Sequence, residues 1–94
     1  KEHYIALDDI FYLEADGMYT KIHLTEEVIT ASKPLKAVLE ELPEQFVRTH
    51  RSYAVNAANI APPPKIKNNL LTLNNNCEVP ISTLKKKALA AALK

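Results

Sequence analysis

The sequence predicts a mostly β domain, built of small antiparallel sheets with one short amphipathic helix and a short C-terminal helix. Three observations lead to this prediction. Runs rich in β-branched and aromatic residues recur along the chain, separated by turn-forming residues. One internal segment carries a clear apolar stripe at helical spacing. The length of 94 residues, with 47% hydrophobic side chains, fits a single globular domain with a modest core.

The first third of the chain is expected to form strands, at about His3–Leu7, Ile10–Ala15, Tyr19–Leu24 and Val28–Ala31. The single glycine of the chain lies in Asp16-Gly17, between the second and third of these runs. An Asp-Gly pair between two strands favours a tight hairpin turn, because glycine readily adopts the positive φ that such a turn needs. The sequence therefore predicts a hairpin that closes at Gly17.

The one clear helix is expected at about Pro34–Leu42. Its apolar side chains follow the i, i+3, i+4, i+7 spacing of one helix face: Leu35, Val38, Leu39 and Leu42. Ser32 suits the N-cap, Pro34 suits the first turn, and Pro43 ends the element. We expect this helix to cover one face of a sheet.

The second half of the chain is expected to hold more strands and the C-terminal helix. The expected elements are strands at Phe46–Arg48 and Tyr53–Val55, a stiff loop at Pro62–Pro64, a hairpin of Leu70–Leu73 with Glu78–Ile81, and a helix from Thr83 to Lys94. Asn68-Asn69 and Asn74-Asn75-Asn76 are interpreted as turns, because asparagine tolerates positive φ. Ser82 is expected to cap the C-terminal helix.

The net charge of +1 results from two halves of opposite sign. Residues 1–47 hold four Lys and ten acidic side chains, a balance of −6. Residues 48–94 hold eight Lys or Arg and one acidic side chain, a balance of +7. A basic half indicates a polyanionic partner even where the total charge does not. Nucleic acid is the first such partner to consider.

Other classes of protein are poorly supported. Cys77 is the single cysteine, so no intrachain disulfide can form and a reducing cytoplasm fits; we expect it to be a buried or half-buried apolar residue. No apolar stretch approaches the roughly 20 residues of a membrane span, and no signal peptide is visible. Cys77 and the histidines His3, His23 and His50 lack the spacing of a zinc site or a nucleophile–base pair. We therefore expect no enzyme, metal, cofactor or membrane partner.

Several blocks of the sequence resemble the LytTR DNA-binding domain. In that family's order they are Leu7-Asp8-Asp9-Ile10, Tyr12-Leu13-Glu14-Ala15 with Gly17, Leu35 to Pro43, Phe46-Val47-Arg48-Thr49-His50-Arg51-Ser52-Tyr53-Ala54-Val55-Asn56, and Val79-Pro80-Ile81-Ser82. Together these blocks cover nearly the whole chain. The resemblance implies a mostly β fold and a bacterial, cytoplasmic transcription regulator. Such a protein binds repeated half-sites in double-stranded DNA, sequence-specifically and as a dimer.

Domains of this family usually follow a phospho-acceptor receiver domain. The resemblance therefore implies that residues 1–94 are one domain, at the C-terminal end of a longer two-component response regulator. Its partners would then include that receiver domain and a cognate sensor kinase. Because family domains usually begin with another strand before the Leu7-Asp8-Asp9-Ile10 block, we expect a shortened N-terminal strand here.

The resemblance places the DNA contacts in three loops at one end of the sheets. Carried over to this chain, the DNA-binding candidates are Thr20, Lys21, His50, Arg51, Ser52, Ser82 and Thr83, to which electrostatics add Lys85 and Lys86. Many family members carry an arginine directly after the Pro-Ile-Ser block, where this chain has Thr83. A base contact of that arginine is therefore in question here.

The chemistry of these candidates leaves alternatives open. The donor fork of Arg51 matches the O6 and N7 acceptors of guanine, but it also suits a phosphate or a carboxylate at the surface. For His50, structural support by hydrogen bonding to the backbone is favoured over DNA contact. Lys21 suits either a phosphate contact or a solvated strand face. Tyr53 is expected in the core with its hydroxyl near the rim, and Asn56 is expected to form a turn.

Three lysines, Lys85, Lys86 and Lys87, stand at the start of the predicted C-terminal helix, where the helix dipole disfavours cations. Phosphate binding explains this arrangement, and a solvated cationic face is the alternative. Lys65 and Lys67 would extend the same basic surface.

The main rival to DNA binding is a protein-interaction module that docks an acidic partner on its basic half. The two differ in their response to salt, because affinity for DNA falls linearly in log salt concentration with a slope near −0.9 per phosphate contacted. RNA binding is less favoured, since few aromatic side chains are available for base stacking.

Overall fold

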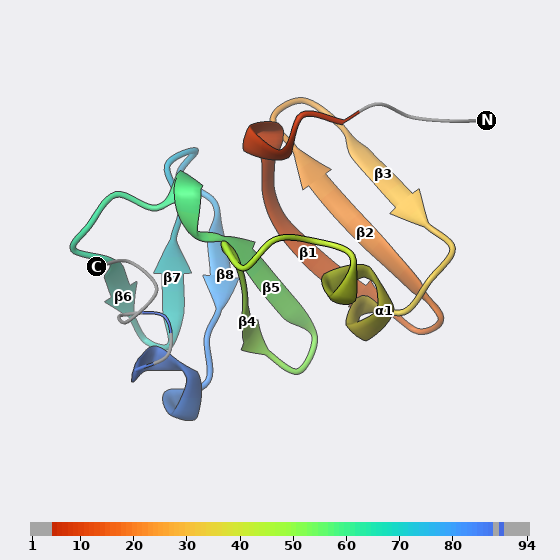
Figure 1. Cartoon of the computed structure of the whole chain (residues 1–94). Coiled ribbons are helices and arrows are strands. Elements are labelled where there is room, and N and C mark those ends of the chain that lie inside the picture. Colours follow the sequence, from red (N-terminus) through yellow and green to blue (C-terminus); the bar gives the residue numbers. More distant parts are fainter. Residues whose placement is uncertain (1–4, 88, 90–94) are drawn as a thin grey trace.

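The computed structural model describes residues 5–87 and residue 89 (Figure 1). Its strands are β1 (Ile10–Asp16), β2 (Tyr19–Leu24), β3 (Val28–Ala31), β4 (Phe46–His50), β5 (Tyr53–Asn56), β6 (Lys65–Lys67), β7 (Leu70–Thr72) and β8 (Glu78–Pro80). Its helices are α1 (Leu35–Glu40) and three short 3-10 helices, η1 (Leu7–Asp9), η2 (Ala57–Asn59) and η3 (Thr83–Lys85). The strands form two antiparallel sheets, ordered β3-β2-β1-β5-β4 and β6-β7-β8. The predicted mostly β fold is confirmed.

The five-stranded sheet has apolar side chains on both faces, and each face has its own cover. One face packs against α1, where Leu13 and Ala54 meet Leu35 and Val38 of the helix. The opposite face packs against the three-stranded sheet, where Val55 meets the side chains Leu71, Val79 and Ile81. Ala54 and Val55 are neighbours in β5 and point to opposite cores, as the alternation of side chains along a strand requires.

The turns fall where the sequence predicts them. Gly17, at φ +62°, closes the β1–β2 hairpin, and β2 and β3 have the predicted bounds. Asn68 and Asn69 have φ of 54° and 60° at the β6–β7 turn, and Asn76 has φ of 68° at the β7–β8 turn. Strand β6 was not predicted, because three residues with one apolar side chain give no usable pattern.

The predicted first strand, His3–Leu7, is wrong over its described part. Residues 3 and 4 lie outside the described residues, and Leu7 begins η1 instead of extending a strand. The carbonyl of Ala6 accepts the amide of Asp9 at 2.9 Å, and side chains bind the next two carbonyls, since Asn56 donates to that of Leu7 and Asn59 to that of Asp8. Asn56 also caps η2 by accepting a hydrogen bond from the amide of Ala58, so its predicted role in a turn is confirmed.

Three further details of the prediction need correction. Helix α1 has Pro34 at its N-cap position, not Ser32, and its apolar face packs as predicted. Cys77 is exposed rather than buried, because it follows the β7–β8 turn at the surface. Ser82 is at the N-cap position of η3, but its side chain makes no capping hydrogen bond. Of the predicted helix from Thr83 to Lys94, the first three residues form η3, Lys86, Lys87 and Leu89 are helical, and residues 88 and 90–94 lie outside the described residues.

Candidate nucleic-acid interface

Three connections lie on the same side of the molecule, spaced along its lower edge in Figure 1. They are the β1–β2 turn, the β4–β5 turn and η3. The amide of Ala15 in β1 donates to the carbonyl of Ser52 at 2.8 Å, and the amide of Ser82 donates to the carbonyl of Thr49 at 2.7 Å. These backbone bonds fix the three connections side by side. We call this end of the molecule the basic end.

Charge is separated between the two ends of the molecule. The opposite end carries four exposed carboxylates, on η1 and on the β2–β3 turn: Asp8, Asp9, Glu26 and Glu27. Near the basic end, acidic side chains lie beside cations. Lys21 Nζ lies 3.9 Å from a carboxylate oxygen of Asp16, and Lys33 Nζ lies 2.5 Å from one of Glu41. Each of these pairs carries no net charge, so the net positive charge of the basic end comes from its other cations, among them Arg48, Arg51 and Lys85.

A shallow, open depression of about 460 Å³ lies at the basic end. Its lining side chains come from the β4–β5 turn and from η3 with its preceding residue: Arg48, His50, Arg51, Ser82 and Lys85. Four of these five are sequence-predicted candidates, so folding brings two of the three predicted loops to one surface. Its lining of cations, a hydroxyl and an imidazole suits an anionic ligand.

The backbone of the β4–β5 turn is held by two side chains from the end of β4, those of Arg48 and His50. The register of β4 against β5 shifts between Arg48 and His50, which leaves Thr49 as a bulged residue with a fully buried side chain. His50 Nδ1 accepts a hydrogen bond from the amide of Ser52 at 3.2 Å. Arg48 Nε donates to the carbonyl of His50 at 3.0 Å, and its Nη2 donates to the carbonyl of Arg51. The hydrogen bond of His50 is of the structural kind that the sequence favoured.

Behind the turn, a carboxylate links β1 to β2 and β5. Glu14 accepts a hydrogen bond from His23 Nε2 at 2.9 Å and one from the Tyr53 hydroxyl at 3.4 Å. The Tyr53 ring lies edge-on to His50, with 5.9 Å between centroids, and Tyr12 stacks on His23 at 4.0 Å. Tyr53 packs against the core between the two sheets, as predicted, and its hydroxyl is bonded to Glu14.

Burial and the neighbouring Glu14 keep both phenols protonated to higher pH. Burial raises the pKa of Tyr53 above its ordinary value of 10.0, and the charge of Glu14 and the hydrogen bond to it raise it further. Burial also raises the pKa of Tyr12, with smaller contributions from the charges that Cys77, Glu14 and Tyr53 carry when they are ionised. Both groups are therefore neutral in the folded state at neutral pH.

These shifts predict a loss of stability in alkali. Between pH 10.0, where a tyrosine of the unfolded chain ionises, and the higher pKa of the folded state, the folded protein binds more protons. Its free energy of unfolding should therefore fall as the pH rises through this window and stay unaffected by these groups below it. Urea unfolding from about pH 8 to about pH 11 measures this fall. Tyr53→Phe should make the fall shallower, and an equally steep fall in that variant would contradict the assignment.

The remaining predicted site residues differ in accessibility. Thr20 is fully buried and its hydroxyl donates to the carbonyl of Lys33 at 2.8 Å, so its side chain is not exposed at the surface where the sequence predicted a DNA contact. Thr20 shares its strand face with Ile22, which packs against the core beneath α1, and this alternation was visible in the sequence. Lys21 is half-buried beside Asp16, Thr83 is exposed on η3, and Lys86 is half-buried.

The positions of two residues at the basic end were not predicted from the sequence. Arg48 lies in the predicted run, but only the structure shows that it lines the depression. Leu84 is 90% exposed on η3, between Thr83 and Lys85, which is unusual for a large apolar side chain. An exposed leucine among turn residues gives no sequence signal that separates it from a core leucine.

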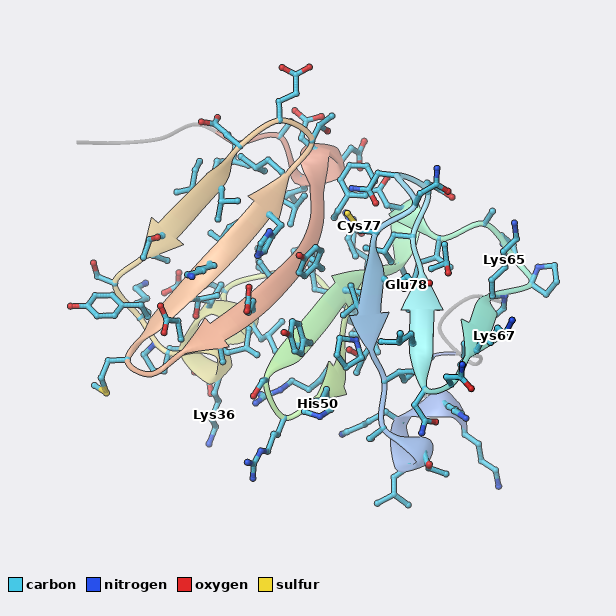
Figure 2. The ribbon with its side chains drawn as sticks, turned by 180° about the vertical axis from the view of Figure 1, so that it is seen from behind. Lys36, His50, Lys65, Lys67, Cys77 and Glu78 are labelled. Carbon is cyan, nitrogen blue, oxygen red and sulfur yellow. The ribbon has the colours of Figure 1, made fainter. Side chains whose placement is uncertain are left out.

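The fold does not bring Cys77 and His50 together as a nucleophile–base pair. Figure 2 shows Cys77 well separated from His50, and Lys65 and Lys67 along the flank on β6. Residues 5–87 and 89 contain no group of three or more His, Cys, Asp or Glu side chains that could hold a metal ion. No helix among the same residues is long and apolar enough to cross a membrane.

The fold and the basic end together define a class of protein, a two-sheet β domain that carries cations and hydroxyls on loops at one end. A family model described as the LytTr DNA-binding domain matches residues 1–94. The chain therefore belongs to the LytTR family of DNA-binding domains, the kind that serves as the output domain of response regulators.

A solved structure supports this assignment. The LytTr DNA-binding domain of a protein assigned as a methyl-accepting/DNA response regulator from Bacillus cereus superposes with a TM-score of 0.79. It shares 27% sequence identity, and the match covers 95% of this chain and 84% of that chain. No curated protein matches the sequence.

Proposed function

We propose that this domain binds double-stranded DNA sequence-specifically, with the β4–β5 turn and η3 entering the major groove. The observation that carries the proposal is the depression at the basic end, where two separate loops place Arg51, Ser82 and Lys85 on one surface. A turn whose backbone is fixed by its own side chains suits base recognition, because little order is lost on binding.

The side chains of the basic end suit two different tasks. Arg51 is exposed at the tip of the turn, and its planar fork can bond guanine O6 and N7 together. Lys85, Lys86 and Lys21 are compact charges suited to phosphates, which set the register of the protein on the duplex. Ser82 and Thr83 supply hydroxyls beside them. This division gives Arg51 the sequence preference and the lysines the affinity.

The whole regulator is proposed to act on repeated half-sites. One copy of this domain presents a small surface, so two copies on adjacent repeats would supply the specificity of a transcription regulator. A receiver domain in the longer protein would bring the two copies together after phosphorylation by a sensor kinase, which raises their effective concentration on DNA.

Selection of binding sites from a random double-stranded DNA library, at two salt concentrations, tests the proposal. Enrichment of a repeated motif, with affinity that falls steeply with salt, is the expected result. If no motif is enriched and binding is insensitive to salt, the protein-interaction module replaces this proposal.

Arg51→Ala is expected to cost about 1–3 kcal/mol of discrimination at one base pair of the selected site. The reason is the loss of the paired donors to guanine. Binding to the selected site and to the same site with that G·C pair replaced, measured by fluorescence anisotropy, gives the number. Lys85→Ala is the matched control, because it should weaken both sites alike and reduce the salt slope by about 1. An unchanged preference in Arg51→Ala would disprove base recognition by this residue.

A further inference from the structure

Two arginines three residues apart line the same depression, but their side chains are placed differently. Arg51 is exposed at the tip of the β4–β5 turn. Arg48 is half-buried in β4, and its guanidinium donates through Nε to the carbonyl of His50 and through Nη2 to the carbonyl of Arg51. Its donors are therefore directed at the backbone that carries Arg51.

We propose that Arg48 is a positioning residue, which sets the sequence preference of the domain by holding the backbone of the β4–β5 turn rather than by binding DNA. The inference rests on the proposed function, since the preference it controls is the one assigned to Arg51. It assigns the two neighbouring cations of the depression to different tasks.

The geometry of the turn explains why this support is needed. The bulge at Thr49 interrupts the ladder, so residues 50–52 have fewer cross-strand bonds to hold them. Side chains supply the missing bonds, from Arg48 to two carbonyls and from the amide of Ser52 to His50 Nδ1. A bidentate contact to guanine requires the Arg51 backbone in one position, and the carbonyl of Arg51 is one of the two that Arg48 holds.

A lysine at position 48 could not make both of these hydrogen bonds at once. The guanidinium is a rigid plane that presents two donors at a fixed spacing, whereas an ammonium is a single point charge. Arg48→Lys therefore preserves the charge and removes the simultaneous bonds to both carbonyls. A residue that acts on phosphate through its charge would tolerate the change, but a residue that holds two carbonyls would not.

The first test measures Arg48→Lys in this chain, with Lys36→Arg, an exchange of the same two residue types at an exposed position of α1, as the matched control. For the selected DNA site and its single-pair variant, Arg48→Lys is expected to lower the ratio of the two affinities by about tenfold, toward that of Arg51→Ala. Its salt slope should stay within a few tenths of the wild-type value, because no phosphate contact is lost. Lys36→Arg should change neither quantity. A retained affinity ratio in Arg48→Lys would overturn the proposal.

A double-mutant cycle separates positioning from an independent contact. If Arg48 acts through Arg51, removing both side chains should lower the ratio of the two affinities no further than removing Arg51 alone. The double variant Arg48→Ala/Arg51→Ala should therefore have the same affinity ratio as Arg51→Ala. Additive losses, or a salt slope that falls by about 1 in Arg48→Ala, would show that Arg48 contacts DNA itself.

A measurement on the free protein makes the inference testable without DNA. Hydrogen exchange of the Ser52 amide should be at least several-fold faster in Arg48→Lys than in wild type, while the amides of β7 are unchanged. Unchanged exchange at Ser52 would contradict the support of the turn by Arg48. Absence of a sequence preference in the wild-type protein would instead contradict the proposed function.

Discussion

Asn56→Ala is expected to lower the free energy of unfolding by about 3 kcal/mol, because it leaves buried polar groups without partners. The Asn56 side chain is fully buried and makes four hydrogen bonds. Its Nδ2 donates to the carbonyls of Leu7 and Ile10, and its Oδ1 accepts from the amide of Ala58 and from Gln45 Nε2. These bonds tie η1, β1 and η2 together.

Urea unfolding measures this loss, and Asn59→Ala is the matched control. Asn59 also donates to two carbonyls, those of Asp8 and Ile10, but it is only half-buried and water can replace it. The control should therefore cost about 1 kcal/mol. Equal losses in the two variants would show that burial of Asn56 does not set the size of the effect.

Ile81→Ala is expected to destabilise the protein by about 3 kcal/mol, within the range of roughly 2–5 kcal/mol for such truncations in a core. Ile81 is 1% exposed in the core between the two sheets, and the next residue, Ser82, begins the loop at the basic end. The amide of Ser82 is bound to the carbonyl of Thr49. Loss of packing at Ile81 should therefore also loosen the depression.

Two controls define the origin of this effect. Ile81→Val should cost only about 0.5–1.5 kcal/mol, because it removes one methylene group. Leu84→Ala, three residues away, should change stability by less than about 0.5 kcal/mol, because the Leu84 side chain is 90% exposed. Urea unfolding of the three variants measures all these losses. A large loss in Leu84→Ala would mean that η3 packs differently from the structure described.

Substitutions at the basic end should affect DNA binding in two different ways. Substitutions of Arg51 and Arg48 should alter which sequences are bound, whereas substitutions of Lys85 should alter how tightly all sequences are bound. If DNA binds at the basic end as proposed, the opposite, acidic end with Asp8 and Glu26 would face away from the duplex. The salt dependence of affinity should then depend on few side chains.

The sequence by itself determined the local structure and the class of protein. The hairpin at Gly17, the bounds of β2 and β3, and the asparagine turns follow from backbone preferences of single residues. The apolar stripe from Leu35 to Leu42 determined α1 and the face it buries. The blocks of family resemblance span enough of the chain to identify the LytTR fold.

Only the tertiary structure decided which polar side chains are accessible and what they contact. Asn56 was predicted to form a turn, but its burial and its bonds to Leu7 and Ile10 depend on segments more than 40 residues away. Arg48 and Arg51 have the same chemistry and lie three residues apart, so no local pattern distinguishes them. The bulge at Thr49 directs one guanidinium at the backbone and the other at solvent. Such placements depend on long-range packing, which the preferences of single residues do not contain.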